Sequence, residues 1–344
     1  MNLLIYSRID FSFKTNLSIE TYEIVLDTVI HSESTFVINS EIGNTMQEDI
    51  VIVHERSFFY IGIVKKISVE GLKIKISAVH FNSVLEAQYL TMNFPLGNLG
   101  EHLKSLITNH LIEHSDSSQN MPYLYVRNES TALGAISVTK PEVKTMTQLI
   151  SELNATNGIR VETRLGIVQG EITHLKMVVR DEVTTLKLRH DLALLRNLSI
   201  NEDGNSPVNK VLLYGESLPL LSYYLLADGS VSNVMNHPLR IQPVRYAYAS
   251  YQSGDNPLVV AKKELIKDKF LHAITFDITM DNQVLVPFVN IALGDQIEFI
   301  TANKTIPSIL SQIRFKNTLK ECSVILGEHR MKLTEKMKLM ERRK

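Results

Sequence analysis

The sequence has few of the features that mark secreted and membrane proteins. Cys322 is the only cysteine among 344 residues, so a disulfide within the chain is impossible and a disulfide-stapled scaffold is excluded. No run of about 18 apolar residues occurs, which argues against a membrane-spanning helix. The first 13 residues lack a basic start and contain Arg8 and Asp10, so we do not expect a signal peptide.

Three motifs typical of common enzyme classes are also missing. The chain has no Gly-x-Ser-x-Gly nucleophile elbow, no Gly-rich phosphate loop ending in Lys-Ser or Lys-Thr, and no Gly-x-Gly-x-x-Gly dinucleotide motif. Cys322 lies in an alternating apolar run, where a thiol is more often a small buried hydrophobe than a nucleophile. With 44% hydrophobic and 21% charged residues, the composition is that of a globular protein of two or three domains.

Charge is unevenly distributed, although the formal net charge is only −1. The segment 330–344 carries seven basic residues against Glu335 and Glu341, so the rest of the chain is acidic. Such a tail suits contact with nucleic acid or an acidic partner, or it is a solvated terminal helix. The sequence leaves both roles open.

The two ends of the chain carry a similar strand pattern. Asp49 begins the apolar run 49–53 and Ile67 closes the run 61–67, while Asp295 and Ile313 hold the corresponding places near the C-terminus. Both pairs are 18 positions apart. We interpret this as a duplicated β module with a different segment inserted between the copies.

The match extends upstream, where each module has an apolar run that ends in aspartate, at 24–27 and at 274–277. Period-two alternation predicts further strands at 59–64 and 73–78, with a hairpin turn at Glu70-Gly71. In the second module it predicts strands at 274–280 and 284–291, joined by a turn at Asp281-Asn282.

The segment between the modules has a mixed pattern that predicts an α+β insert. Apolar residues at helical spacing between Leu99 and Leu111 predict a helix that runs to His114, and a Thr-x-x-Gln capping box at Thr145 predicts a second helix that ends at Asn157-Gly158. Strands are expected at 159–165 and 208–214, and a hairpin at 223–231. A third helix is expected from Pro257, capped by Asn256, with lysines on its solvated or phosphate-binding face.

One motif has the spacing of a metal site. His110, Glu113 and His114 form an His-x-x-Glu-His string, in which two histidines one turn apart can share a zinc ion and the glutamate can act as base. Glu171 or Glu182 would be the third ligand. Against this, the predicted helix ends at His114, and histidines near a helix C-terminus are favoured by the helix dipole alone.

Two aromatic clusters offer a binding alternative. Phe58-Phe59-Tyr60 and Tyr246-Ala247-Tyr248 could stack on sugars or bases, although alternation places half of each cluster in a core. A carbohydrate-binding module is therefore a further hypothesis. We assign no catalytic, cofactor-binding or metal-binding residue, and no cofactor, and we do not expect an enzyme.

Two stretches carry a resemblance to a known family. They are 140–159, with Met146-Thr147-Gln148-Leu149-Ile150 before Gly158-Ile159, and 262–333, with Thr275-Phe276-Asp277, Leu293-Gly294-Asp295 and 309–315. With β modules at both ends, the chain resembles the hub proteins of phage tail baseplates. This group includes contractile-tail hubs and the N-terminal structural region of tail-associated lysins.

The resemblance implies a mostly β, α+β fold with two tail-tube-like β modules flanking an α+β insert. Three subunits would form a homotrimeric, pseudo-sixfold ring that continues the sixfold tail tube and adapts it to the threefold tail tip. The implied domains are module 1 (1–90), an α+β outer domain (91–200), a strand-rich connecting domain (201–255), module 2 (256–330) and a basic tail (331–344).

The resemblance also implies partners and a location. The partners are further copies of the chain, a distal tail protein or tail-tube hexamer, the tape-measure protein, and receptor-binding or tail-tip proteins. DNA would pass through the channel without specific binding. The protein would be made in the bacterial host cytoplasm and reside in the virion tail baseplate or tip.

One departure from the resemblance bears on activity. Many tail-associated lysins continue into a peptidase or glycosidase region, whereas this sequence ends at Lys344, so we expect lytic activity on another polypeptide. The alternative function is a tail-associated peptidoglycan hydrolase or zinc metallopeptidase using His110, Glu113 and His114.

Overall fold

The computed structural model divides into two compact units, each formed from separate stretches of the chain. Unit 1 comprises Met1–Ser83, Thr184–Glu202 and His272–Lys344, and unit 2 comprises Val84–Val183 and Asp203–Leu271. The structure describes residues 1–28, 31–39, 43–55, 58–136, 141–181, 186–202, 208–227, 229–266, 272–280, 285, 291–302 and 304–327. The basic tail, the predicted turn at Asp281-Asn282 and most of the predicted strand 284–291 lie outside these residues.

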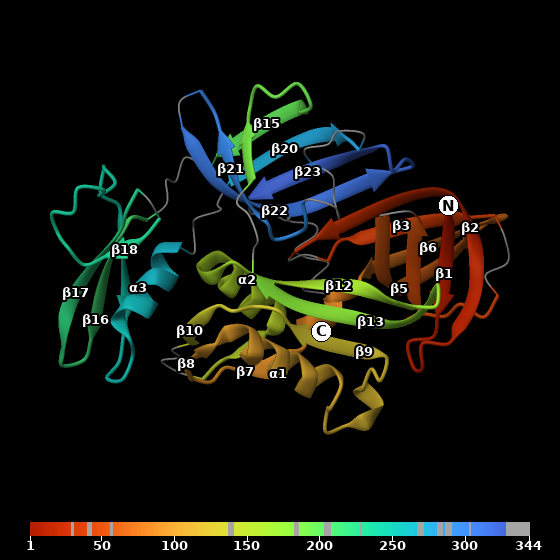
Figure 1. Ribbon diagram of the computed structural model, residues 1–344, viewed down its shortest axis with the longest axis horizontal. Helices are drawn as coiled ribbons and strands as arrows, with labels where there is room; N and C mark the ends of the chain where they lie inside the picture. The colour runs from red at the N-terminus through yellow and green to blue at the C-terminus, as the bar shows by residue number, and fades with distance from the viewer. Residues whose placement is uncertain are drawn as a thin grey trace. The chain divides into compact units, whose positions relative to one another are not determined.

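The first 80 residues of unit 1 form a closed sheet (Figure 1). Because β1 pairs antiparallel with both β2 and β4, the order β1-β4-β5-β6-β3-β2 returns to its start as a barrel. The β5–β6 turn contains Gly71 at φ 65°, as the predicted hairpin requires. The strands are β1 (Asn2–Tyr6), β2 (Phe13–Asp27), β3 (Glu33–Ile38), β4 (Ile50–Glu55), β5 (Phe58–Glu70) and β6 (Lys73–His80).

The rest of unit 1 adds a second set of strands in the order β14-β21-β22-β23-β20-β15. All neighbours in this set are antiparallel except β14 and β21, which are parallel. Two of the strands come from the middle of the sequence and the others from its end. The strands are β14 (Leu186–Arg189), β15 (Arg196–Glu202), β20 (His272–Thr279), β21 (Gln296–Ile300), β22 (Thr305–Lys316) and β23 (Glu321–Gly327).

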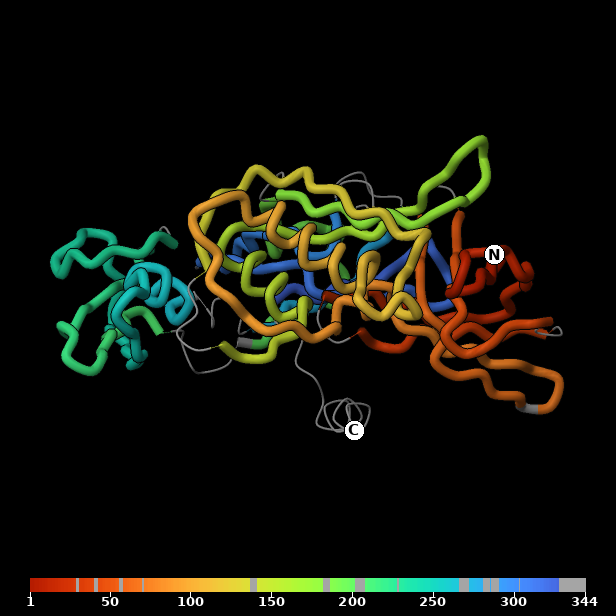
Figure 2. The backbone as a smooth tube through the Cα atoms, turned by 90° about the horizontal axis from the view of Figure 1, so that it is seen from below, coloured from red at the N-terminus to blue at the C-terminus, as the bar shows by residue number. Residues whose placement is uncertain are grey.

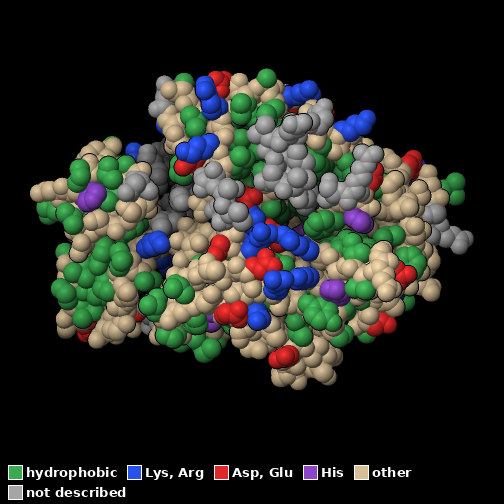
Figure 3. Space-filling view, viewed as in Figure 1, with side chains coloured by type: hydrophobic (Ala, Val, Ile, Leu, Met, Phe, Trp, Pro, Cys, Tyr) green, Lys and Arg blue, Asp and Glu red, His purple; other side chains and the backbone are tan. Residues whose placement is uncertain are grey.

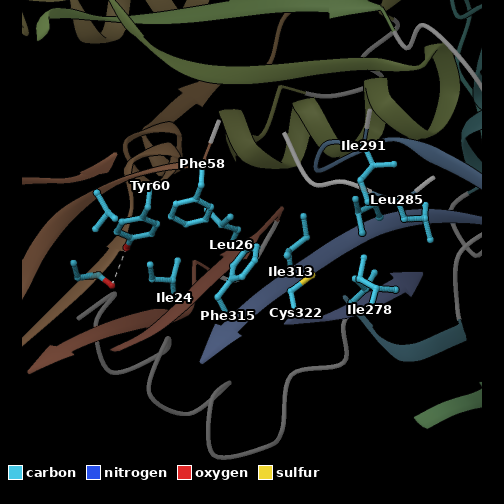
Figure 4. Close-up of a cluster of buried hydrophobic side chains, with 14 of the residues drawn as sticks. Ile24, Leu26, Phe58, Tyr60, Ile278, Leu285, Ile291, Ile313, Phe315 and Cys322 are labelled. Carbon is cyan, nitrogen blue, oxygen red and sulfur yellow. Dashed lines mark hydrogen bonds between the residues drawn. The ribbon is translucent and has the colours of Figure 1, made fainter. Parts of the chain in front are cut away.

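The two strand sets are joined by antiparallel pairing of β2 with β22, and they share one hydrophobic core. Each of the two strands extends beyond the end of its neighbour in its own set. The backbone amides and carbonyls of the extension are therefore available to pair with the other strand. In Figure 4 the buried side chains of the first set, such as Ile24 and Phe58, lie beside those of the second set, such as Ile313 and Phe315. The Phe58 and Phe315 rings meet edge to face, with centroids 5.0 Å apart.

Unit 2 combines short sheets with three helices, α1 (Leu99–Leu111), α2 (Met146–Asn157) and α3 (Pro257–Ile266). A long antiparallel hairpin, β12–β13, extends one of its sheets through parallel pairing of β13 with β9 (Figure 2). A four-stranded sheet has the order β18-β17-β16-β19, and two small sheets pair β10 with β8 and β11 with β7.

The remaining elements of the chain are the strands β7 (Gln88–Leu90), β8 (Phe94–Asn98), β9 (Leu124–Asn128), β10 (Leu133–Ile136), β11 (Val143–Thr145), β12 (Ile159–Val168), β13 (Glu171–Asp181), β16 (Lys210–Gly215), β17 (Leu218–Leu225), β18 (Val231–Ser232) and β19 (Tyr246–Ser250), and the short 3-10 helices η1 (Phe81–Glu86) and η2 (Ser117–Gln119).

The predicted helix signals are confirmed. Thr145 and Gln148 form the reciprocal capping box that begins α2, and Gly158 ends it in the left-handed conformation at φ 70°. The Asn256 side chain accepts from the Leu258 amide, 3.1 Å away, so α3 begins with the expected Asn-Pro pair. Lys262 of α3 donates to the Thr156 carbonyl at 3.0 Å, so this lysine is occupied by a contact to α2.

The shared core predicts a large cost for truncating Phe315. Phe315→Ala should lower the free energy of unfolding by about 3–5 kcal/mol, because the ring is buried and its removal leaves a cavity. Leu220→Ala, at an exposed position of β17, should change it by less than about 0.5 kcal/mol. Denaturant melts of both variants measure the difference, and equal stabilities would contradict the shared core.

Candidate functional site

The most specific local structure in unit 1 is a turn held by an aspartate, and it occurs twice. Asp49 precedes β4, and its Oδ2 accepts from the Met46 amide at 2.7 Å. Asp295 precedes β21, and its Oδ2 accepts from the Ala292 amide at 2.7 Å. In each turn the aspartate amide also donates to the carbonyl of that same earlier residue, at 3.3 Å and 3.1 Å.

Each turn is tied to the following long strand by the same backbone bonds. The Asp49 carbonyl accepts from the Val64 amide at 2.9 Å, and the Asp295 carbonyl accepts from the Leu310 amide at 2.8 Å. The residue before each aspartate, Glu48 or Gly294, has positive φ and donates back to the same long-strand residue. Because both turns make the same bonds, each aspartate lies the same number of residues before the long-strand residue that it contacts.

A β-bulge follows at the same place in both strand sets. The pairing of β5 with β6 shifts between Val64 and Lys66, and that of β22 with β23 shifts between Leu310 and Gln312. The shared turn and bulge make β4, β5 and β6 the counterparts of β21, β22 and β23.

The pairing register corrects one part of the predicted repeat. In the first set Phe36 of β3 lies opposite Ile76, and in the second set Phe276 of β20 lies opposite Val324. The run 274–277 therefore corresponds to β3, and its predicted match to 24–27 in β2 is wrong. Both runs are apolar strands ending in aspartate, which is too common a pattern to fix the alignment. The counterpart of β2 is β15, the next strand beyond β20.

The β2–β22 junction is continuous along its length. Residues Glu23 to Asp27 pair with Lys316 to Gln312, and the Glu23 carboxylate lies 3.4 Å from the Arg314 guanidinium. Just past the end of β22, the Asn317 side chain accepts from the Tyr22 amide of β2 at 2.8 Å, and the Asn317 amide donates to the Tyr22 carbonyl at 2.9 Å. The junction is thus an edge-to-edge extension of one sheet by another within the chain.

The sequence-derived zinc candidates are not brought together. Helix α1 ends at Leu111, so Glu113 and His114 lie beyond it and are not on one helical face with His110. His110 Nδ1 lies 2.9 Å from the Leu106 carbonyl, and His114 Nδ1 accepts from the Asp116 amide at 3.0 Å. Glu171 lies in β13, and Glu182 is outside the described residues. In the described part of the chain, no group of three His, Cys, Asp or Glu side chains is placed to hold a metal.

The other sequence candidates divide between core and surface. Burial raises the pKa of the Cys322 thiol to about 12, which disfavours a nucleophilic thiolate. Phe58 and Tyr60 are buried in the core of unit 1. Tyr246 and Tyr248 are exposed on β19 with their rings edge to face, 5.7 Å apart, and remain available for stacking.

Unit 2 carries a charged cluster over β12 and β13, visible in Figure 3 as basic side chains around acidic ones. Burial alone would raise the pKa of Glu162, but Arg160, Arg164 and Arg180 hold it below its usual value. The Glu162 carboxylate lies 2.9 Å, 2.5 Å and 3.3 Å from the three guanidinium groups. The Glu162 carboxylate therefore offsets one of the three positive charges of the cluster.

The fold is that of a mostly β protein in which one set of strands continues the sheet of the other through the β2–β22 pairing. Among solved structures, the chain is similar to three phage-related tail proteins along nearly its whole length. A tail protein from Neisseria meningitidis MC58 aligns with TM-score 0.53 and 14% identity over 95% of this chain and 97% of the other.

The prophage tail protein gp18 from Listeria monocytogenes EGD-e gives TM-score 0.55 and 12% identity over 99% of both chains. The 43 kDa tail protein of prophage MuSo2 from Shewanella oneidensis gives 0.56 and 10%, over 96% and 98%. The chain therefore has the fold of phage tail proteins, and the resemblance seen in its sequence is confirmed at that level.

No protein-family model and no curated protein matches the sequence. In the part of the chain that is described, none of the helices has the length and apolar character needed to cross a membrane.

The repeated turn predicts a cost for removing its side-chain acceptor. Asp295→Ala should lower the free energy of unfolding by about 1–2 kcal/mol, because the Ala292 amide loses its bond to Oδ2. Asp295→Asn keeps an oxygen at this place and should cost less. Thermal melts compare the two variants, and an equal loss would mean that the carboxylate charge, not the bond to the amide, stabilises the turn.

Proposed function

We propose that the chain is a structural baseplate hub of a phage or phage-tail-like particle. Three subunits form a ring that continues the sixfold tail tube and adapts it to the threefold tail tip. The ring surrounds a channel for the passage of DNA or the tape-measure protein. The observation that carries this proposal is the repeat of turn, bulge and strand order in two sets joined edge to edge.

The physical reason is symmetry. A ring made of three identical chains presents six equivalent modules only if each chain contributes two that are built alike. In this proposal the two strand sets of unit 1, from the stretches 1–83, 184–202 and 272–327, form the tube-like modules. Unit 2, from the stretches 84–183 and 203–271, is the α+β insert, and the segment 331–344 is the basic tail.

The proposed partners follow from this role. The modules stack on a tail-tube hexamer or distal tail protein, and the ring also contacts the tape-measure protein and receptor-binding or tail-tip proteins. The protein resides in the virion baseplate or tip after synthesis in the host cytoplasm. In this proposal its role is structural and not enzymatic.

The ring is tested by mass and image. Multi-angle light scattering of the purified chain should give three times the 39.0 kDa subunit mass, and negative-stain images should show a threefold ring with a central hole. The result should hold over a tenfold dilution if the subunits assemble specifically. A lone subunit at every concentration would contradict the hub.

The competing zinc peptidase is tested with one variant. His110→Ala should leave the subunit number unchanged, because the His110 Nδ1 contacts the Leu106 carbonyl of its own helix. The wild-type chain should carry less than about 0.1 zinc per subunit after dialysis, measured by plasma emission. One zinc per subunit, lost together with peptide cleavage in His110→Ala, would favour the enzyme instead.

A further inference from the structure

Several strand edges in unit 1 have a neighbour on one side only among the described residues, and those of β15 and of one stretch of β5 are related to the β2–β22 junction. β15 pairs with β20 and ends the order of the sheet. On β5, the stretch Lys66 to Glu70 pairs with β6, while β4 covers only Phe58 to Ile63. Both edges therefore expose backbone amides and carbonyls that can pair with another strand.

These edges are the counterparts of the two strands that form the β2–β22 junction. In the sheet, β15 lies next to β20 as β2 lies next to β3. The paired residues place Ile200 at the position that Ile24 occupies in the first set. β5 corresponds to β22 through the shared bulge, which places Val69 where the second set has Phe315. At the junction itself, Ile24 lies directly opposite Phe315.

Burial differs sharply between the counterparts. Ile24 and Phe315 are both 0% exposed, whereas Ile200 is 38% and Val69 is 66% exposed. The side chains are apolar in all four places. An exposed strand edge with apolar side chains is an aggregation hazard unless another strand covers it. The pattern is that of a junction whose two halves are present on one chain but are not paired with each other.

We infer that the free edge of β15 pairs antiparallel with the free edge of β5 from a second copy of this chain. Transferring the register of the β2–β22 junction places Ile200 opposite Val69 of that copy, Ser199 opposite Glu70, and Asn201 opposite Ser68. The inference rests on the proposed hub and supplies the contact between its subunits. The occupant is a second copy of this chain, because β15 lacks the partner strand that β2 has in β22, and β5 is the counterpart of β22.

The pairing joins two different surfaces, so it is a heterologous contact. Such contacts form a closed ring when the rotation between copies closes and a filament when it does not. Within one chain the β2–β22 junction fixes the rotation and displacement that relate one module to the next. A β15–β5 contact of the same geometry repeats that step between chains, so every module meets its neighbours alike.

A paired-cysteine variant tests the contact. In the full chain carrying Val69→Cys and Ile200→Cys, mild oxidation should link the subunits of an assembled ring, because opposed residues on paired strands are close enough for a disulfide. A non-reducing gel should show covalent multimers in at least half of the protein. Mixing the two single variants during assembly should stop the linkage at dimers. Cys322 is buried and does not compete.

The matched control moves one cysteine by one residue. Val69→Cys with Asn201→Cys places the thiols on opposite faces of the joined sheet and should give less than a tenth of the cross-linking. A second variant, Ile200→Asp, should reduce assembly at least tenfold without lowering the melting temperature of the subunit, because Ile200 is exposed. Leu220→Asp, at an exposed position in unit 2, should leave assembly unchanged.

The outcomes separate this contact from the hub itself. A ring of three subunits that does not cross-link through 69 and 200, or that cross-links equally in the register control, overturns the β15–β5 pairing and leaves the hub in place. A wild-type chain that stays monomeric overturns both.

Discussion

The pairing of β2 with β22 is the constraint on which the rest of unit 1 depends. It brings the ends of a 344-residue sequence into one sheet and one core, so residues such as Ile24 and Phe315 are buried together. Without it, each strand set would present an apolar edge to water. The pairing also explains why β2 and β22 are long: each serves its own set along one part of its length and the junction along another.

The aspartate turns give this architecture its regular geometry. Each turn has a residue with positive φ and a carboxylate that accepts a hydrogen bond from a backbone amide, and the long strand bonded to the turn contains a β-bulge. Together these features set the direction in which the long strand continues past its partners in the same set. Since both strand sets use the same device, both long strands bend at equivalent places. Equivalent bends let one set be extended by the other without distortion.

Much of this could be predicted from the sequence because the signals are local. Alternation located most strands of unit 1, the capping box located α2, and the spacing of Asp49 and Asp295 revealed the repeat. The contributions of β14 and β15 could not be found this way, because a short strand carries no mark of which distant strand it pairs with. The upstream alignment failed for a similar reason, since only pairing distinguishes β2 from β3. The zinc motif was set aside in the sequence because it stands at a helix end, and helix α1 does end before Glu113 and His114.

The junction has a consequence for how such proteins diverge. Besides the Glu23–Arg314 ion pair and the Asn317 side chain, it is held by ladder bonds between main-chain groups, which every residue except proline supplies in full. Selection at this boundary therefore acts on shape and on apolar or polar character, not on the identity of particular side chains. The same scaffold can therefore be built from very different residues, and the whole-length structural matches share only 10–14% of their residues with this chain.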